Sequence, residues 1–278
     1  MKMNEMFRAG IWVRAAGETE KKFSQLRSTF SVHGWNAAKL RVVGLGSFHC
    51  YINGRRVSDE LYLPLYTNFE ARRDWPVGET LSGSRLYVPE YDILPYLREG
   101  ENTLVIHYGG GWYTYDEEVP YGTAKAIWEI EAEDGAGEIL LGSSDADRIG
   151  DSFVTDFALT RKERQDLSHP NSRAEAAEQD DGGWAHAAAA VPVDTEYEFS
   201  DCPADKAFDT GPAVLLKRTG DHAVYDWGRN ASGYPVLRLT GKAGDTVRVI
   251  FSEERTDDGE PDARFGHEQE LEYVCGGE

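Results

Sequence analysis

Cysteine is scarce in this sequence, with three cysteines among 278 residues. Cys50, Cys202 and Cys275 lie too far apart for a zinc knuckle or a Cys-x-x-Cys redox pair. An odd number of cysteines also argues against a disulfide framework, because such frameworks pair their cysteines. The cysteine content therefore favours a reducing compartment.

Long apolar runs are also lacking. The segment from Met1 to Trp12 carries charges at Lys2, Glu5 and Arg8, so it has no apolar run of signal-peptide length. Elsewhere no segment approaches the roughly 20 apolar residues that a membrane-spanning helix needs. We therefore expect a cytoplasmic protein without a membrane span.

Positive charge is scarce relative to negative charge. The chain has 29 Lys and Arg residues against 49 Asp and Glu residues, a formal net charge of −20. This balance works against nucleic acid or an anionic membrane as a partner, because both are bound through Lys and Arg. A neutral sugar meets no such penalty. The carboxylates could attract calcium or simply keep the surface soluble, and the charge alone does not separate these explanations.

Glycine and aromatic residues are abundant in a way that is typical of an all-β protein. The chain holds 29 Gly, 14 Tyr, 11 Phe and 7 Trp residues. Aromatic side chains fit the half-buried surface of a pleated sheet, and glycine serves turns that need a positive φ.

The length of the chain predicts two domains, because single domains most often run to about 100–150 residues.

Strand-like segments separated by turn signals fill residues 1–150, the expected first domain. Asn53-Gly54 is a strong hairpin signal, placed between strand-like residues 48–52 and a return strand at 55–57. We expect a short turn of helix between Asp92 and Leu97. Further strands are expected at 40–43, 86–88, 103–108, 126–131 and 138–141. Strands at roughly 8–12-residue spacing predict a β-sandwich.

The strand pattern weakens over residues 151–209 and returns over 210–278. The alanine run Ala187–Ala190 is compatible with a short helix, but we favour an extended connector over 151–209 that packs on the first domain. The second domain is expected at 210–278. Its expected strands are 214–216, 222–225, 234–240, 246–252 and 271–275.

Trp112 and Tyr113 follow a glycine run, Gly109–Gly111, directly after an expected strand. A glycine run lets backbone and rings approach a ligand, and an exposed aromatic face stacks on the apolar face of a sugar. Alternatively, Trp112 is a buried anchor of the core and the glycines form a bend. Both interpretations remain open from the residues alone.

Several motifs, in order and spacing, resemble the N-terminal part of bacterial α-L-rhamnosidases, glycoside hydrolase family 78. They are Tyr51–Val57, Pro64-x-x-Thr67-Asn68-Phe69, Leu97-x-x-Gly100-Glu101-Asn102, Gly111-Trp112-Tyr113 and Asp226-x-Gly228-x-Asn230-x-x-Gly233-Tyr234. The resemblance covers nearly the whole chain. It implies two jelly-roll-like β-sandwich domains joined by the connector, the second one incomplete, ahead of a helical catalytic barrel.

The resemblance also implies where the chemistry takes place. The family removes terminal α-linked L-rhamnose from glycosides with inversion, which needs two carboxyl groups about 6.5–9.5 Å apart. In the family these carboxyl groups lie on an (α/α)6 barrel beyond the last residue of this chain, so we expect no catalytic residue here. Trp227 and Tyr234 are then candidates for a surface that docks against the barrel.

Some family members bind rhamnose through the N-terminal sandwich with the help of calcium. By position, the residues carried over as calcium ligands are Asn68, Asp116 and the carbonyl of Pro120. Trp112, Tyr113, Asn68 and Asp116 are the candidates for sugar binding. Calcium normally takes 6–8 oxygen ligands, so two side chains leave most of the shell to backbone and water. A capping Asn and a solvated Asp are the alternative.

Three hypotheses about function follow. The first is the non-catalytic N-terminal portion of an α-L-rhamnosidase, whose partners are rhamnose-containing glycosides and its own catalytic barrel. The second is a stand-alone carbohydrate-binding protein that recognises rhamnose with calcium. The third is an autonomous hydrolase with a site between the two sandwiches.

Overall fold

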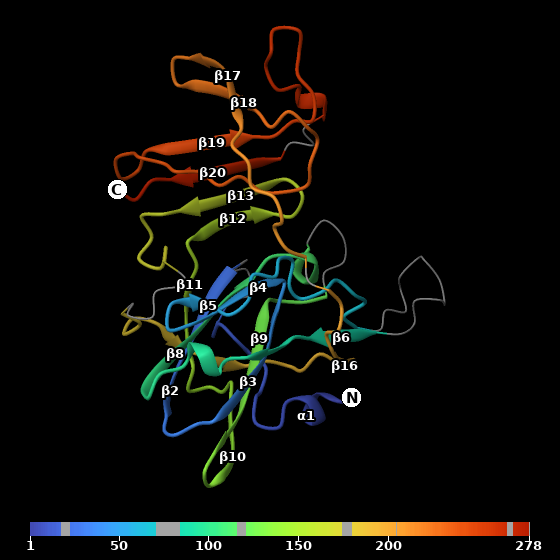
Figure 1. Ribbon diagram of the computed structural model, residues 1–278, viewed down its shortest axis with the longest axis vertical. Helices are drawn as coiled ribbons and strands as arrows, with labels where there is room; N and C mark the ends of the chain where they lie inside the picture. Colours follow the sequence, from blue (N-terminus) through green and yellow to red (C-terminus); the bar gives the residue numbers. More distant parts are fainter. Residues whose placement is uncertain are drawn as a thin grey trace. The chain divides into compact units, whose positions relative to one another are not determined.

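The computed structural model describes residues 1–17, 23–70, 84–115, 121–173, 180–203, 205–265 and 269–277. These residues form two compact units (Figure 1). Unit 1 consists of Met1–Ser152 and Arg173–Asp205, and unit 2 of Phe153–Ser172 and Lys206–Glu278. The described helical segments are short: α1 (Met3–Met6) and the 3₁₀ turns η2 (Leu94–Tyr96), η3 (Trp112–Thr114) and η4 (Ala263–Phe265). The prediction of an all-β protein is confirmed.

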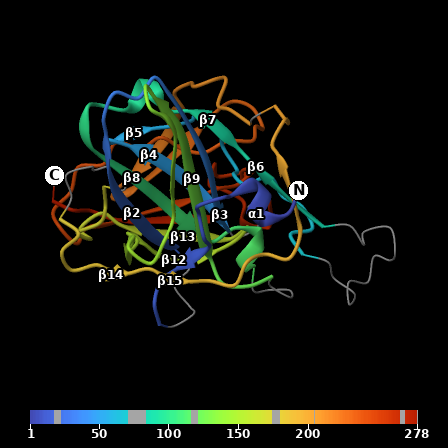
Figure 2. The same cartoon turned by 90° about the horizontal axis from the view of Figure 1, so that it is seen from below.

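Unit 1 is built on two six-stranded sheets. Sheet A has the order β15-β1-β9-β3-β7, with β10 also paired to β9. Its strands are β1 (Val13–Arg14), β3 (Ala37–Leu45), β7 (Glu90–Asp92), β9 (Lys125–Asp134), β10 (Gly137–Gly142) and β15 (Ala188–Ala189). Sheet B has the order β14-β11-β2-β8-β4-β5, and Figure 2 shows β2, β8 and β4 side by side. Its strands are β2 (Phe23–Val32), β4 (Ser47–Ile52), β5 (Arg55–Arg56), β8 (Gly100–Gly109), β11 (Arg148–Asp151) and β14 (Ala185–His186).

The main core of unit 1 lies between sheets A and B. Successive side chains of a strand point to opposite faces, so alternate residues of each strand reach this core. Sheet A contributes Leu40, Val42 and Trp128, and sheet B contributes Leu26 and Ile106. The two sheets therefore form a sandwich, as the strand spacing predicts.

A second core covers the other face of sheet A at one end. There Val43 and Ile127 of sheet A pack with Trp12, Tyr113 and Tyr197. A small parallel sheet lies over this region and consists of β6 (Arg85–Val88) and β16 (Glu196–Phe199). We call this cluster the outer core, and it includes the side chains beneath the candidate site.

The local turn predictions in unit 1 are largely confirmed. Asn53 and Gly54 both have positive φ, 50° and 77°, as a tight hairpin turn between β4 and β5 requires. The segments 126–131 and 138–141 pair within β9 and β10, and the short helical turn forms at η2. The strand containing residues 40–43 does not pair with 48–52, because the chain crosses from sheet A to sheet B between them.

Unit 2 contains one four-stranded sheet of order β12-β13-β20-β19 and a separate hairpin, β17-β18 (Figure 1). The strands of the sheet are β12 (Val154–Ala158), β13 (Lys162–Asp166), β19 (Thr246–Ile250) and β20 (Glu270–Val274). The hairpin consists of β17 (Val214–Thr219) and β18 (His222–Asp226). β13 and β20 run parallel although more than 100 residues separate them in sequence.

One expectation for the later part of the chain differs from the structure. Residues 234–240 are not a strand, although their sequence suggests one. A strand needs a hydrogen-bonded neighbour, and the described residues supply none there. The alanine run at 187–190 is extended, as favoured over the alternative of a helix, and its residues Ala188–Ala189 form β15, which pairs with β1. Residues 151–209 contribute β12 and β13 to unit 2 and β14, β15 and β16 to unit 1.

Within the described ranges, no helix is both long and apolar enough to cross a membrane.

Candidate functional site

A cluster of aromatic rings lies where β8 ends in unit 1. It combines Tyr66 and Phe69, from the segment after β5, with Trp112, Tyr113 and Tyr115, from η3 and the residue after it. The ring centres of Tyr66 and Trp112 are 5.3 Å apart, and those of Trp112 and Tyr115 are 5.5 Å apart. We call Tyr66, Trp112 and Tyr115 the aromatic platform.

The platform stands on buried rings of the outer core. Tyr66 is 58% exposed and Trp112 is 46% exposed, whereas Phe69 and Tyr113 are each 1% exposed. The rings of Phe69 and Tyr113 meet edge to face at 5.5 Å between centres, and that of Tyr113 stacks on Tyr121 at 5.8 Å. Edge-to-face and offset-stacked pairs are the favoured geometries of aromatic rings. Exposed rings therefore rest on a packed base.

The glycine run before Trp112 forms a bend that close backbone packing demands. Gly111 has a φ of 66°, and a Cβ placed on it would lie 2.1 Å from the carbonyl oxygen of Gly46. A side chain at this position would collide with backbone, so glycine is required. The glycines thus form the bend of the structural alternative, but Trp112 is half exposed and is not a core anchor.

Polar contacts hold the rings of the base. The Tyr121 hydroxyl donates to Asn68 Oδ1 at 3.0 Å, and the Tyr113 hydroxyl donates to Glu70 Oε1 at 3.3 Å. Burial raises the pKa of Tyr113, and the nearby Glu70 carboxylate raises it further. Tyr113 therefore stays a neutral hydrogen-bond donor.

The predicted site residues lie in different surroundings. Trp112 is exposed in the platform, Tyr113 is buried beneath it, and half-buried Asn68 accepts a hydrogen bond at its side. Asp116 and Pro120 lie outside the described residues. The structure thus brings Trp112, Tyr113 and Asn68 into one region.

The described residues do not fit a calcium site by themselves. They include no group of three or more His, Cys, Asp or Glu side chains that could hold a metal ion. Asn68 is the one predicted calcium ligand among them, and its Oδ1 already accepts the Tyr121 hydroxyl. Calcium normally takes 6–8 oxygens. The arrangement proposed below is therefore argued from the described aromatic rings alone.

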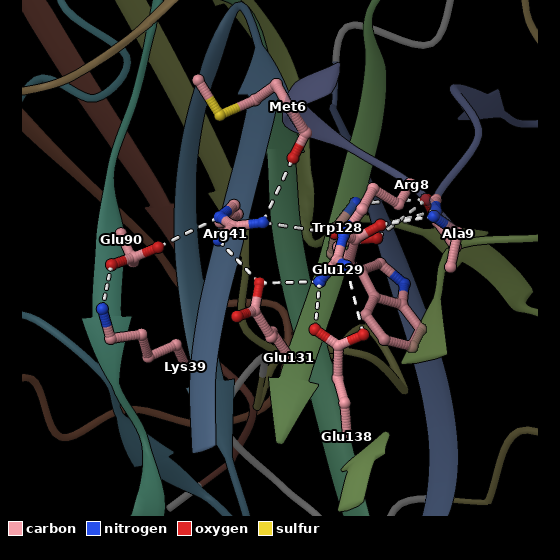
Figure 3. Close-up of polar contacts among 12 residues, drawn as sticks. Met6, Arg8, Ala9, Lys39, Arg41, Glu90, Trp128, Glu129, Glu131 and Glu138 are labelled. Atoms are coloured by element: carbon pink, nitrogen blue, oxygen red, sulfur yellow. Dashed lines mark hydrogen bonds and ion pairs between the residues drawn. The ribbon is translucent and has the colours of Figure 1, made fainter. Parts of the chain in front are cut away.

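The densest described group of charges in unit 1 lies on the outer face of sheet A and is shown in Figure 3. Arg41 contacts three carboxylates, those of Glu90 at 3.0 Å, Glu129 at 3.4 Å and Glu131 at 2.8 Å. Lys39 adds a second cation on Glu90 at 2.7 Å. These carboxylates are engaged in ion pairs.

Glu129 is fully buried and also fastens the N-terminal segment to the sheet. Its Oε2 accepts the backbone N–H groups of Ala9 at 2.5 Å and Gly10 at 3.2 Å. A glycosidase acid–base pair needs room for a water between its carboxyl groups and for a sugar beside them. Glu129 is occupied by amides and a guanidinium, so this network has a structural role.

Comparison with known proteins identifies the family. Residues 34–205, more than half of the chain, match the α-L-rhamnosidase N-terminal domain. Residues 216–278 match the concanavalin-like domain of bacterial α-L-rhamnosidases. The chain belongs to the α-L-rhamnosidase family. It is homologous to the N-terminal part of these enzymes.

Individual α-L-rhamnosidases agree with this assignment. An α-L-rhamnosidase of Streptomyces avermitilis is 27% identical over 270 residues, which cover 90% of this chain and 24% of the relative. The crystal structure of an α-L-rhamnosidase from Aspergillus terreus has the same fold, with a TM-score of 0.83 at 18% identity, covering 100% of this chain and 32% of that one. The crystal structure of a Streptomyces avermitilis α-L-rhamnosidase complexed with L-rhamnose gives a TM-score of 0.71 at 23% identity. The match covers 92% of this chain and 25% of that one. The chain spans about a quarter of the length of its curated relatives.

Two residues of this aromatic region, Tyr66 and Lys125, were not expected from the sequence. Tyr66 lies within the motif Pro64-x-x-Thr67-Asn68-Phe69, two positions before Asn68, so its place in that motif could have indicated that it belongs to the site. Lys125 begins β9 beneath Tyr113 and is 8% exposed. A lysine at the start of an apolar strand usually indicates a solvated end, and only the packing of distant segments shows otherwise.

Proposed function

We propose that unit 1 is a non-catalytic binding domain for terminal L-rhamnose and presents rhamnose-containing glycosides to the catalytic barrel of an α-L-rhamnosidase. The observation that carries the proposal is the exposed Trp112 ring, set against Tyr66 on a buried aromatic base. Aromatic faces of this kind stack on the apolar face of a sugar, and a packed base reduces the ordering needed on binding.

Charge and composition support a neutral ligand. The chain carries a formal net charge of −20, which disfavours phosphorylated or anionic partners but leaves a neutral sugar unaffected. L-rhamnose also has a methyl group at C6, so it offers an aromatic ring more apolar surface than a hexose with a hydroxymethyl group there. The platform therefore suits a 6-deoxy sugar.

The remainder of the chain has a supporting role in this proposal. The described residues hold no helical barrel, and the densest carboxylate network of unit 1 is committed to ion pairs and backbone amides. We assign the chemistry of rhamnoside cleavage to another part of the parent protein. Unit 2, which contains Trp227 and Tyr234, would provide the surface that packs against the barrel.

Isothermal titration of the whole chain with L-rhamnose tests the proposal. We expect saturable heat in the millimolar range and weaker binding of L-mannose, which differs only by a hydroxyl group at C6. The titration is repeated in EDTA, where unchanged affinity would show that the rings suffice and a loss of binding would assign calcium to the site. Absence of heat with L-rhamnose would reject the proposal.

A second assay addresses catalysis directly. The purified chain at high concentration should release no nitrophenol from an aryl α-L-rhamnoside. Release above that of the buffer would favour the autonomous hydrolase and contradict the non-catalytic role.

A further inference from the structure

Lys125 is a buried cation directly beneath the platform. Lys125 is 8% exposed, and its Nζ donates a hydrogen bond to the carbonyl oxygen of Val191 at 2.7 Å. The same nitrogen lies 5.6 Å from the ring centre of Trp12 and 5.7 Å from that of Tyr113. Two aromatic faces thus take the place of water around this ammonium group.

Burying the Lys125 charge in these surroundings costs folding free energy, so stability of the fold alone does not explain a lysine at this position. The neighbouring side chains belong to the outer core, which is apolar, and burial lowers the pKa of Lys125 even though the Glu70 carboxylate opposes the shift. An apolar side chain of similar length would fill this space without desolvating a charge. Residues that break a local rule of packing are often found where function requires them.

The ring that Lys125 contacts, Tyr113, belongs to the same packed group of rings as Trp112. Tyr113 is held by the ammonium on its face, by the stacked ring of Tyr121, and by the Glu70 carboxylate at its hydroxyl.

A series of ring contacts joins Tyr113 to Trp112. Tyr113 meets Phe69 edge to face at 5.5 Å between ring centres, and Phe69 meets Tyr66 in the same way at 6.1 Å. Tyr66 in turn lies 5.3 Å from Trp112. A displaced Tyr113 ring would therefore shift the rings packed on it and, through Tyr66, the support of the Trp112 ring.

We propose that Lys125 is a positioning residue of the sugar site, whose charge fixes the Tyr113 ring and thereby holds Trp112 against Tyr66. The effect on sugar affinity rests on the function proposed above. The effect on the Trp112 ring is a property of the free protein and needs no ligand.

The variant Lys125→Met removes the charge and keeps an unbranched side chain of similar length. Lys39→Met is the matched control, because Lys39 lies on the same face of sheet A but is 58% exposed and pairs with Glu90 away from the platform. Near-UV circular dichroism reports Trp112 as the difference between each protein and its Trp112→Phe counterpart.

We expect three results for Lys125→Met. The L-rhamnose affinity falls about tenfold, as loss of a desolvated cation–π contact predicts. The Trp112 difference spectrum changes in the absence of sugar. The melting temperature stays equal to that of the original protein or rises, because a buried charge has been removed. Lys39→Met keeps the original affinity and Trp112 spectrum.

Two results would overturn the inference. An unchanged Trp112 spectrum in Lys125→Met would show that the ammonium does not position the ring. A clear fall in melting temperature would show that Lys125 supports the fold as a whole. If the original protein binds no L-rhamnose, the proposed function fails, and the ligand-free Trp112 spectrum still decides the role of Lys125.

Discussion

Unit 1 buries the apolar side chains of its strands, whereas unit 2 leaves many of them exposed. Leu40 and Ile130 of unit 1 are 0% exposed, while Val214 and Ile250 of unit 2 are 63% and 51% exposed. The strands of unit 1 face a second sheet, and an apolar face becomes a core only when another layer covers it. The stability of the chain is therefore concentrated in unit 1, and unit 2 keeps apolar surface available for packing.

The largest difference between the two units in stability lost on substitution is expected for charged residues. Glu129→Ala in unit 1 should destabilise the protein by about 3–5 kcal/mol, because it leaves Arg41 and two backbone amides without their buried partner. Glu272→Ala in unit 2 removes an ion pair with Arg164 whose side chains are 36% and 30% exposed, and should cost at most about 1 kcal/mol.

Urea unfolding of both variants checks this contrast. Equal losses of stability in the two variants would show that the buried network does not set unit 1 apart.

Substitution of apolar residues should also cost more stability in unit 1 than in unit 2, by a similar amount. Leu40→Ala opens a cavity between sheets A and B and should cost about 2–5 kcal/mol. Val236→Ala in unit 2, where the side chain is 79% exposed, should change stability by no more than about 0.5 kcal/mol. Thermal unfolding followed by circular dichroism measures both, and a large effect at Val236 would mean that this side chain is covered in solution.

A smaller effect concerns the pH dependence of unit 1. Burial raises the pKa of Asp147 above its ordinary value of 3.8, against hydrogen bonds that include one from Trp128 Nε1 at 3.0 Å. The folded state then binds the proton more readily than the unfolded state, so this group's contribution to stability falls as pH rises from 3.8 through the folded pKa.

Asp147→Asn removes that titration. The variant should lose stability less steeply, or gain it more steeply, than the original protein as pH rises through this window. Urea midpoints measured at several pH values test the difference, and parallel curves would contradict the assignment of the shift to Asp147.

The sequence predicted features that depend on neighbours in the chain. The Asn53-Gly54 turn forms because both residues tolerate a positive φ, and the β9-β10 hairpin forms around a glycine-containing turn. Residues 234–240 have the composition of a strand, yet strand formation also needs a partner that local sequence does not reveal.

The candidate site was only partly predictable for the same reason. Trp112 and Asn68 were found through their motifs, but the exposure of Trp112 depends on Gly111 packing against Gly46, which is distant in sequence. The burial of Lys125 likewise depends on Trp12, more than 100 residues earlier in the chain. Contacts of this kind follow from tertiary packing.

Each unit has a half-exposed tryptophan, Trp112 in unit 1 at 46% and Trp227 in unit 2 at 52%, and this pair gives the most direct test of the sugar site. L-rhamnose should be titrated into Trp112→Ala and Trp227→Ala side by side with the original chain. The account predicts that binding is lost in Trp112→Ala and unchanged in Trp227→Ala. Unchanged binding in Trp112→Ala, or loss only in Trp227→Ala, would contradict it.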